Sequence, residues 1–387
     1  MLRNLSVVDP PFLIGLGLVM LGMFVASWFR VQHGWLRWTV RVLGVVLSVV
    51  MVASALNARY AYLPTIAAVF GRTAMDQVSP AQLRQLELAS GRPGGAVRGS
   101  GGPRLAFASG PDPDLRHGVV AAFKIPSTLS HFHARTAEVY LPPAYFESPR
   151  PHLPVIELLH GTPGSPADWT RAGFADVTAD EYASAHQGLA PVLVMPDVNG
   201  GWRSDSECVN GKRGQVQTYL TYDVRDAVVA RFHTRADAAG WAIAGFSEGA
   251  YCALQIGLRH PDLYSAIGDF SGEEGPSVSG GARSLFTGSR QQADQQAAQY
   301  DPAVLLRQWD RSVRPPIWFE VGTHDITSHA MASLDLMARA DGFDTHFVIQ
   351  QGTDHGFASW RDAIRDALPW FANRFATPSA ADTTNGA

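Results

Sequence analysis

Ser247 lies at the centre of a G-x-S-x-G pattern, Gly-Phe-Ser-Glu-Gly at residues 245–249. A short apolar run precedes the pattern, and a run compatible with a helix, residues 250–259, follows it at once. Between a strand and a helix this pattern indicates a nucleophile elbow, in which the two glycines let the strand and the helix approach closely. The pattern therefore predicts a nucleophilic Ser247 exposed on a tight turn. The alternative is a glycine-rich turn whose serine only caps the helix.

A serine hydroxyl is a poor nucleophile at neutral pH and needs a nearby base, which a third group orients. Asp325 follows the apolar run at residues 317–321, and His355 lies in a Gly-flanked loop before the last helix-like run. Serine, acid and histidine in this chain order, each after a late strand, are typical of one class of triad. We therefore predict that Ser247, Asp325 and His355 are the catalytic residues.

Other residues compete for two of these roles. For the acid, Glu320 lies at the end of the same apolar run and Asp354 directly precedes His355. Adjacent residues rarely face each other, and the loop position after the strand favours Asp325. The other histidines considered for the base are His324, His329 and His346. His346 lies inside an expected strand, and His324 and His329 lie on either side of the acid loop. His355 is therefore the predicted base.

The negative oxygen that forms during acyl transfer needs hydrogen-bond donors aimed at it. The elbow offers the amide of Glu248, and the loop after the early run at residues 155–159 offers a second amide. Because Pro163 has no N–H, Thr162 is the predicted second donor. Loop residues expected on the same side, and therefore candidates for substrate binding, are Trp169, Trp202, Arg203, Glu273 and Glu274.

Strand-like and helix-like runs alternate after residue 112, which predicts an α/β fold with a mainly parallel sheet covered by helices on both faces. The expected strands cover residues 119–125, 136–141, 155–159, 192–195, 241–244, 266–270, 317–321 and 345–349. The expected helices cover residues 175–185, 218–231, 250–259, 329–340 and 360–375.

Two apolar runs near the N-terminus, residues 12–29 and 38–56, predict a transmembrane helical hairpin. Arg30, Arg37 and Arg41 lie in or beside the link between them, which predicts a cytoplasmic link and an outward-facing catalytic domain. The segment at residues 60–70, which includes Tyr60 and Tyr62, is too short to span a membrane, and we expect it at the membrane surface.

Two other interpretations of these runs remain open. A signal sequence cut near residues 53–55 would give the same compartment but release the enzyme, and a buried helical hairpin of a soluble protein would give no anchor.

The resulting domain organisation has four parts. Residues 1–71 form the predicted membrane anchor, 72–111 a flexible Gly-rich linker with a short helix at 80–89, 112–375 the catalytic domain, and 376–387 a disordered tail. Cys208 and Cys252 lie in the catalytic domain, where either a disulfide or two free thiols fit the sequence.

The composition narrows the class of partner. The chain has 387 residues, 46% hydrophobic and 17% charged, and a net charge of −4, so nothing in it indicates binding to nucleic acid. The two cysteines have no metal-ligand spacing, and we expect neither a metal nor a cofactor. The expected partners are a small-molecule or lipid ester and the membrane, while the oligomeric state is left open.

As an ordered set, several motifs resemble the putative esterase family, which includes esterase D-type S-formylglutathione hydrolases, feruloyl esterase modules and envelope mycolyltransferases. They are the run at 136–145, the His160-Gly161 loop with Trp169 after it, the Gly-Phe-Ser-Glu-Gly elbow, Phe-Ser-Gly at 270–272, and the Asp325 and His355 loops. The resemblance covers about residues 112–375 and implies an α/β hydrolase fold with the triad and oxyanion hole described above. The membrane hairpin departs from the family's soluble or secreted members.

The sequence thus predicts an extracytoplasmic, membrane-anchored serine esterase that forms an acyl-enzyme. An acyltransferase acting on envelope sugars or lipids would use the same triad, because only the acceptor differs. A binding protein that keeps the fold without catalysis is the alternative from another class.

Overall fold

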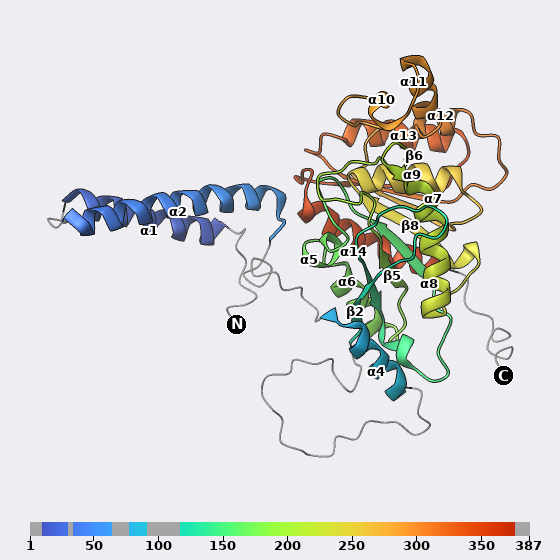
Figure 1. Ribbon diagram of the computed structural model, residues 1–387, viewed down its shortest axis with the longest axis horizontal. Helices are drawn as coiled ribbons and strands as arrows, with labels where there is room; N and C mark the ends of the chain where they lie inside the picture. Colours follow the sequence, from blue (N-terminus) through green and yellow to red (C-terminus); the bar gives the residue numbers. More distant parts are fainter. Residues whose placement is uncertain (1–9, 30–33, 64–76, 91–116, 376–387) are drawn as a thin grey trace.

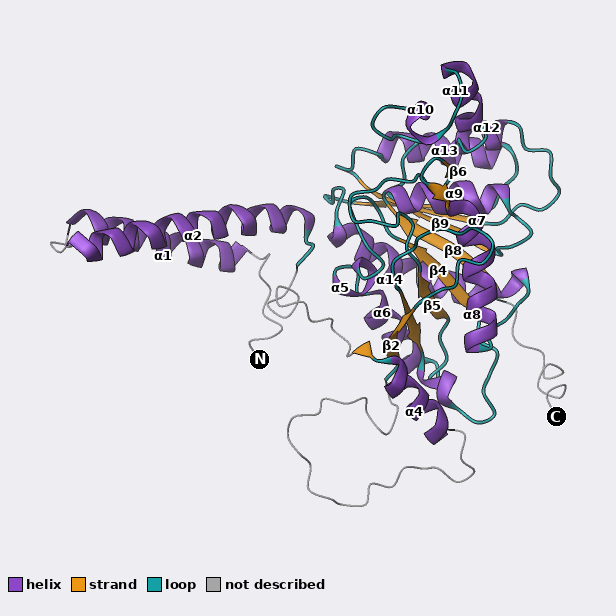
Figure 2. Cartoon of the chain, in the orientation of Figure 1, coloured by secondary structure: helices purple, strands orange, loops and turns teal. Residues whose placement is uncertain are grey.

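The computed structural model describes residues 10–29, 34–63, 77–90 and 117–375 (Figure 1). A nine-stranded sheet forms the centre of the larger part (Figure 2), in the order β1-β2-β3-β5-β4-β8-β9-β10-β11. The strands are β1 Gln77–Val78, β2 Val119–Phe123, β3 Ala137–Leu141, β4 Val155–Leu159, β5 Val192–Met195, β8 Trp241–Phe246, β9 Ala266–Phe270, β10 Ile317–Gly322 and β11 Thr345–Gln350. The predicted tail, residues 376–387, lies outside the described residues.

The sheet is mixed but mainly parallel, which confirms the predicted α/β class. Only β3 runs antiparallel to its neighbours β2 and β5, and the pairs from β5 through β4, β8, β9 and β10 to β11 are all parallel. Since parallel strands end at one common edge, the loops after β4, β8, β10 and β11 leave the sheet on the same side.

Helices cover both faces of the sheet because alternate residues of each buried strand point to opposite sides. In β8, Trp241 and Ile243 belong to one hydrophobic core, whereas Ala242, Ala244 and Phe246 belong to the other. The first face carries α4 Pro80–Ser90, α8 Arg225–Phe232, α9 Glu248–Arg259, α12 Pro302–Arg307 and α13 Ser328–Ala340. The second carries α5 Asp168–Arg171, α6 Ala175–Ala185 and α14 Phe357–Arg374.

The sheet begins earlier in the chain than the sequence predicted. β1 pairs with β2 through Gln77 and Val78, and Leu83 of α4 is buried in the core. Residues 77–90 are therefore part of the folded domain, and the predicted linker at 72–111 is wrong over this stretch. The short helix predicted at 80–89 is confirmed as α4, but its packing against the domain was missed, because a two-residue strand gives no periodic signal and tertiary packing does not show in the sequence. Residues 91–111 lie outside the described residues.

Several short elements between β5 and β10 were also not predicted. They are β6 Asn210–Gly211, β7 Gly214–Gln215, α7 Val216–Thr218, α10 Ala282–Leu285, α11 Arg290–Ala298 and α12. The helix predicted at 218–231 is present, as a π-helical turn at Tyr219–Val224 followed by α8. α11 contains no apolar residue other than alanine and begins with a capping box between Ser289 and Gln292. It lacks the apolar periodicity on which the helix prediction depended.

At the N-terminal end, α1 Pro10–Phe29 and α2 Gly34–Tyr60 lie along each other, beside the domain that contains the sheet (Figure 1). Among the described residues, one helix is long and apolar enough to cross a membrane, the part of α2 from Arg41 to Ala58. A signal sequence near the N-terminus has the same length and apolar composition.

Candidate active site

The turn between β8 and α9 holds Ser247 in a strained conformation, with φ 55° and ψ −127°. The strand and the helix lie so close that a Cβ atom on Gly245 would be 2.1 Å from the carbonyl oxygen of Gly249. A Cβ atom on Gly249 would be 2.2 Å from the carbonyl oxygen of Leu159 in β4. Both positions therefore require glycine, and the structure has the geometry of the predicted nucleophile elbow.

The structure brings Ser247, His355 and Asp325 together in one hydrogen-bonded chain. His355 Nε2 lies 2.9 Å from Ser247 Oγ, and His355 Nδ1 lies 3.0 and 3.1 Å from the two oxygens of Asp325. His355 follows β11 and Asp325 follows β10, so these side chains meet because the two strands end at the same edge of the sheet. The arrangement is that of a serine nucleophile, a base and an orienting acid.

The environment of Asp325 keeps its carboxylate charged. Burial by itself would raise the pKa of Asp325, but the hydrogen bond and positive charge of His355 and the backbone N–H of Thr327 lower the pKa below its ordinary value. The Thr327 amide and hydroxyl each donate to Asp325 Oδ1 at 2.9 Å. The carboxylate is thus held toward the imidazole.

The competing acids and bases have other partners. Glu320 accepts hydrogen bonds from Trp318 Nε1 at 2.7 Å and from Gln350 Nε2 at 2.6 Å, and burial raises its pKa to about 7. It faces α14 rather than His355, because Gln350 also bonds to the carbonyl of Ser359 in that helix. The ring of His346 packs against Trp318 at 4.1 Å. The geometry therefore favours Asp325 and His355.

The loop after β4 passes directly beside the serine. A Cβ atom on Gly161 would lie 3.0 Å from Ser247 Cβ, which places the next residue, Thr162, at the rim of the same site. Glu248 opens α9, and the first N–H groups of a helix have no partner within the helix. These positions suit the predicted oxyanion donors, the amides of Thr162 and Glu248, whose role stays a prediction.

The side chain of Glu248 has a role that the sequence did not indicate. Its buried carboxylate accepts hydrogen bonds from the Thr162 hydroxyl, from Asn199 Nδ2 at 2.8 Å and from the Glu207 amide at 3.1 Å. Burial, followed by the charge of Asp205, raises its pKa to about 7. Glu248 thus ties the elbow to the Thr162 loop. Only the fold brings these residues together, and no sequence signal would have identified the contact.

A second network holds the other side of the Thr162 loop. Arg135 Nη1 donates to the carbonyl of Gly164 at 3.0 Å, and Arg135 Nη2 pairs with Asp197 at 2.6 Å. His160 Nδ1 lies 2.8 Å from the carbonyl oxygen of Gly161. These contacts hold the loop in place beside Ser247, as an oxyanion site requires.

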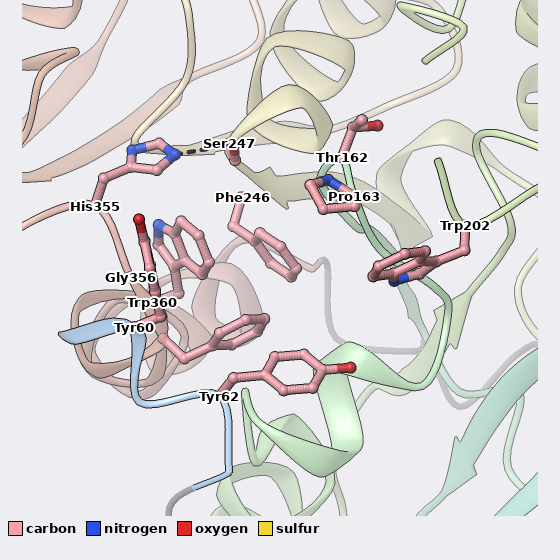
Figure 3. Close-up of a pocket in the computed structure, with 12 residues that line it drawn as sticks. Tyr60, Tyr62, Thr162, Pro163, Trp202, Phe246, Ser247, His355, Gly356 and Trp360 are labelled. Carbon is pink, nitrogen blue, oxygen red and sulfur yellow. Dashed lines mark hydrogen bonds between the residues drawn. The ribbon is translucent and has the colours of Figure 1, made fainter. Parts of the chain in front are cut away.

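A pocket of about 510 Å³ opens at Ser247. Its lining is Tyr60, Tyr62, Gly161, Thr162, Pro163, Trp202, Phe246, Ser247, His355, Gly356, Phe357 and Trp360 (Figure 3). Aromatic side chains make up much of the wall, and the serine and histidine bring reactive polar groups to one part of it. Most of this lining was not predicted, because it comes from segments far apart in the sequence.

Of the five predicted substrate-binding residues, the structure places only Trp202 in the lining. Trp169 is fully buried and packs edge-on against Phe246 at 4.9 Å, so its prediction as a substrate contact is wrong. Trp169 lies on the short helix α5, and its large apolar side chain is buried in the core instead of facing the pocket. Arg203 lies on the surface with its guanidinium 5.9 Å from the Trp202 ring.

The predicted acidic contacts also lie outside the pocket lining. Glu274 is exposed and Glu273 is half-buried. Burial and the charge of Asp205 raise the pKa of Glu273, while the charge of His355 opposes this increase. Glu273 is therefore close enough to the triad to interact with it electrostatically.

Cys208 and Cys252 form a disulfide, which decides between the two states that the sequence left open. The bond joins the loop that contains Glu207 to α9, five residues after Ser247. It fixes that loop against the elbow helix, on the side where Glu248 makes its contacts.

The sheet, the strained elbow and the hydrogen-bonded serine, histidine and aspartate together define an α/β hydrolase. The chain belongs to the putative esterase family, whose model, described as Putative esterase, matches residues 132–371. This family places it among hydrolases of the esterase type.

Two relatives are similar to the chain in sequence. An uncharacterised protein of Corynebacterium glutamicum is 34% identical over 254 residues, which are 64% of this chain and 59% of that relative. This chain thus matches less than two thirds of that relative's length. An S-formylglutathione hydrolase of Paracoccus denitrificans is 24% identical over 62% of this chain and 88% of the relative.

Solved structures support the fold. An S-formylglutathione hydrolase of Agrobacterium tumefaciens matches with a TM-score of 0.55 and 21% identity, over 67% of this chain and 96% of its own. A ferulic acid esterase matches with a TM-score of 0.55 and 18% identity, over 67% of this chain and 99% of its own.

The first prediction separates the two candidate acids. Asp325→Ala should lower kcat by about three to four orders of magnitude, because His355 loses the group that orients it. Glu320→Ala should keep most of the activity, although loss of the partner of Trp318 and Gln350 costs about 1–3 kcal/mol of stability. Hydrolysis of a p-nitrophenyl ester, measured well below each variant's melting temperature, gives kcat. A larger loss for Glu320→Ala than for Asp325→Ala would contradict the assignment.

The second prediction concerns the Glu248 side chain. Glu248→Ala should lower kcat about a hundredfold with little change in KM, because the Thr162 loop loses its tie to the elbow and one oxyanion donor is misplaced. Glu248→Gln, which keeps one acceptor oxygen, should fall between this variant and the wild type. Glu181→Ala, on the exposed face of α6, is the matched control. Equal kcat values for Glu248→Ala and the wild type would disprove the role.

Proposed function

We propose that the protein is a membrane-anchored serine esterase that acts outside the cytoplasmic membrane and cleaves a carboxylic ester through an acyl-enzyme. The observation that carries this proposal is the chain of hydrogen bonds from Ser247 through His355 to Asp325, on a strained elbow at an aromatic pocket. Relatives named as an S-formylglutathione hydrolase and a ferulic acid esterase support cleavage of an acyl bond.

The geometry supports a two-step reaction. Ser247 Oγ attacks the ester carbonyl carbon and transfers its proton to His355 Nε2, while Asp325 stabilises the resulting imidazolium. The amides of Thr162 and Glu248 bind the negative oxygen of the tetrahedral intermediate. When this intermediate collapses, the alcohol leaves with the proton from His355 and the acyl group stays on Ser247.

In the second step an acceptor hydroxyl loses its proton to His355 and attacks the acyl carbonyl. The new intermediate then releases Ser247 Oγ, which regains the proton from His355. With water as acceptor the product is a free acid, and with an alcohol it is a new ester. Hydrolysis and acyl transfer therefore differ only in which acceptor reaches the acyl-enzyme.

Three features support a catalytic domain on the outer side of the cytoplasmic membrane. The apolar stretch Arg41–Ala58 is long enough to span a bilayer core. The arginines in and around the link between the two N-terminal helices favour a cytoplasmic link. The disulfide between Cys208 and Cys252 fits an oxidising compartment, since such bonds are rare in the cytosol.

The function is tested with the purified full-length protein in detergent. A fluorophosphonate probe should label the wild type, whereas Ser247→Ala should take no label because the nucleophile is missing. Incubation with labelled short-chain and lipid esters should release the free acid as the main product. A transferred acyl product would favour the acyltransferase instead. If the wild type takes no label and turns over no ester, the enzymatic function is overturned and the protein is a binding protein.

The topology is tested with reporters fused after Gly110. Alkaline phosphatase, which is active only after export, should be active at this position, and β-galactosidase should be inactive. After cell lysis the fusion should sediment with the membranes if α2 remains attached, and it should be soluble if a signal sequence has been removed. Cytoplasmic reporter activity would contradict the proposed orientation.

A further inference from the structure

The end of α2 lies at the active site. We call residues Tyr60, Ala61 and Tyr62 the helix foot. Tyr60 ends α2, and the apolar stretch that could cross a membrane ends at Ala58. Because a helix rises about 1.5 Å per residue, Tyr60 is only about 3 Å beyond this stretch along the helix axis. If α2 spans the bilayer, the helix foot is at its surface.

The helix foot is docked against the catalytic domain. Ala61 is only 5% exposed and belongs to the same core as Phe246 and α14. Its carbonyl oxygen accepts a hydrogen bond from Arg361 Nη1 at 3.2 Å, and the same guanidinium nitrogen donates to the carbonyl of Ala172 at 2.9 Å. Burial lowers the pKa of Arg361, as expected for a guanidinium inserted between these segments.

Tyr62 makes two further attachments. Its ring packs edge-on against Phe357 at 5.3 Å, and its hydroxyl donates to Asp168 Oδ1 at 2.9 Å. Asp168 in turn accepts from the amide of Ser165 at 2.8 Å, at the end of the loop that contains Thr162. The helix foot is thus connected both to the pocket wall and to the loop beside Ser247.

Both tyrosines line the pocket that contains Ser247 and His355. Figure 3 shows the serine and the histidine on one side of this space and Tyr62 on the other, with Phe246 and Trp360 between them. Of the described residues that line the pocket, none is Asp, Glu, Lys or Arg. Such a wall favours an apolar chain over a charged group, because a buried charge would find no partner.

We propose that this pocket binds the aliphatic acyl chain of a lipid ester held in the membrane, and that the helix foot is the wall that selects long chains. The proposal rests on the proposed function, since it assigns the acyl group that Ser247 receives. A lipid at the bilayer surface can place its ester at the serine while its chain stays among aromatic side chains. The membrane helix therefore contributes directly to substrate specificity.

The test compares short and long esters on the full-length protein in detergent–phospholipid mixed micelles. The variants are Tyr60→Ala and Tyr62→Ala, with Tyr62→Phe to remove only the hydroxyl. The readout is the ratio of kcat/KM for p-nitrophenyl palmitate to that for p-nitrophenyl butyrate. In both alanine variants this ratio should fall by about tenfold or more, equivalent to about 1.4 kcal/mol. Tyr62→Phe keeps its ring and should keep the wild-type ratio.

Tyr222→Ala is the matched control, because this tyrosine is 43% exposed and packs near His260, outside the pocket. It should leave the ratio unchanged. Fluorophosphonate labelling of Ser247 shows that each variant is folded. Tyr60 is half-exposed, so its substitution tests the wall even if Tyr62→Ala unfolds.

Two outcomes would overturn the proposal. If palmitate and butyrate turnover fall equally, or not at all, in Tyr60→Ala, the tyrosines serve only as interfacial anchors of the helix. If the wild type does not turn over palmitate, the pocket does not accept long acyl chains and the proposal fails. In either case, labelling and butyrate turnover by the wild type would still support the esterase, so failure of this inference differs from failure of the proposed function.

Discussion

The close approach of α9 to β4 and β8 is the constraint on which the site depends. It is achieved only because Gly245 and Gly249 have no Cβ atoms, and it leaves Ser247 in a backbone conformation that an unsupported residue would abandon. The cores on both faces of the sheet maintain this turn, since β8 and α9 are buried along their lengths. The packing that stabilises the fold therefore also holds Ser247, which is only 9% exposed, at the wall of the pocket.

Parallel strand order then determines which loops can reach the serine. The loops after β4, β10 and β11 leave the same edge of the sheet as the elbow and supply Thr162, Asp325 and His355. The buried Glu248 carboxylate and the Arg135–Asp197 pair hold the Thr162 loop from two directions. Such support matters because preorganised donors need no reorganisation during the reaction. The disulfide adds a covalent link on the same side.

The N-terminal segment is integrated with this arrangement more closely than a tether would be. Residues 77–90 extend the sheet, and the helix foot packs on α14 and contacts Asp168. The sequence indicated an anchor followed by a linker and a separate domain. In the structure the end of α2 is part of the pocket wall, so the helix that favours a membrane location also bounds the space beside the nucleophile.

The sequence by itself determined the fold class, most strand positions and the triad candidates, because buried parallel strands are apolar runs and each catalytic residue follows one of them at a recognisable turn. Tertiary structure alone decided which polar groups meet. In the structure Trp169 is buried in the core, and Glu320 accepts hydrogen bonds from Trp318 and Gln350. Cys208 forms a disulfide with Cys252, and Tyr60 and Tyr62 line the same pocket as Ser247. These contacts join segments up to almost 190 residues apart, and local periodicity carries no information about such distances.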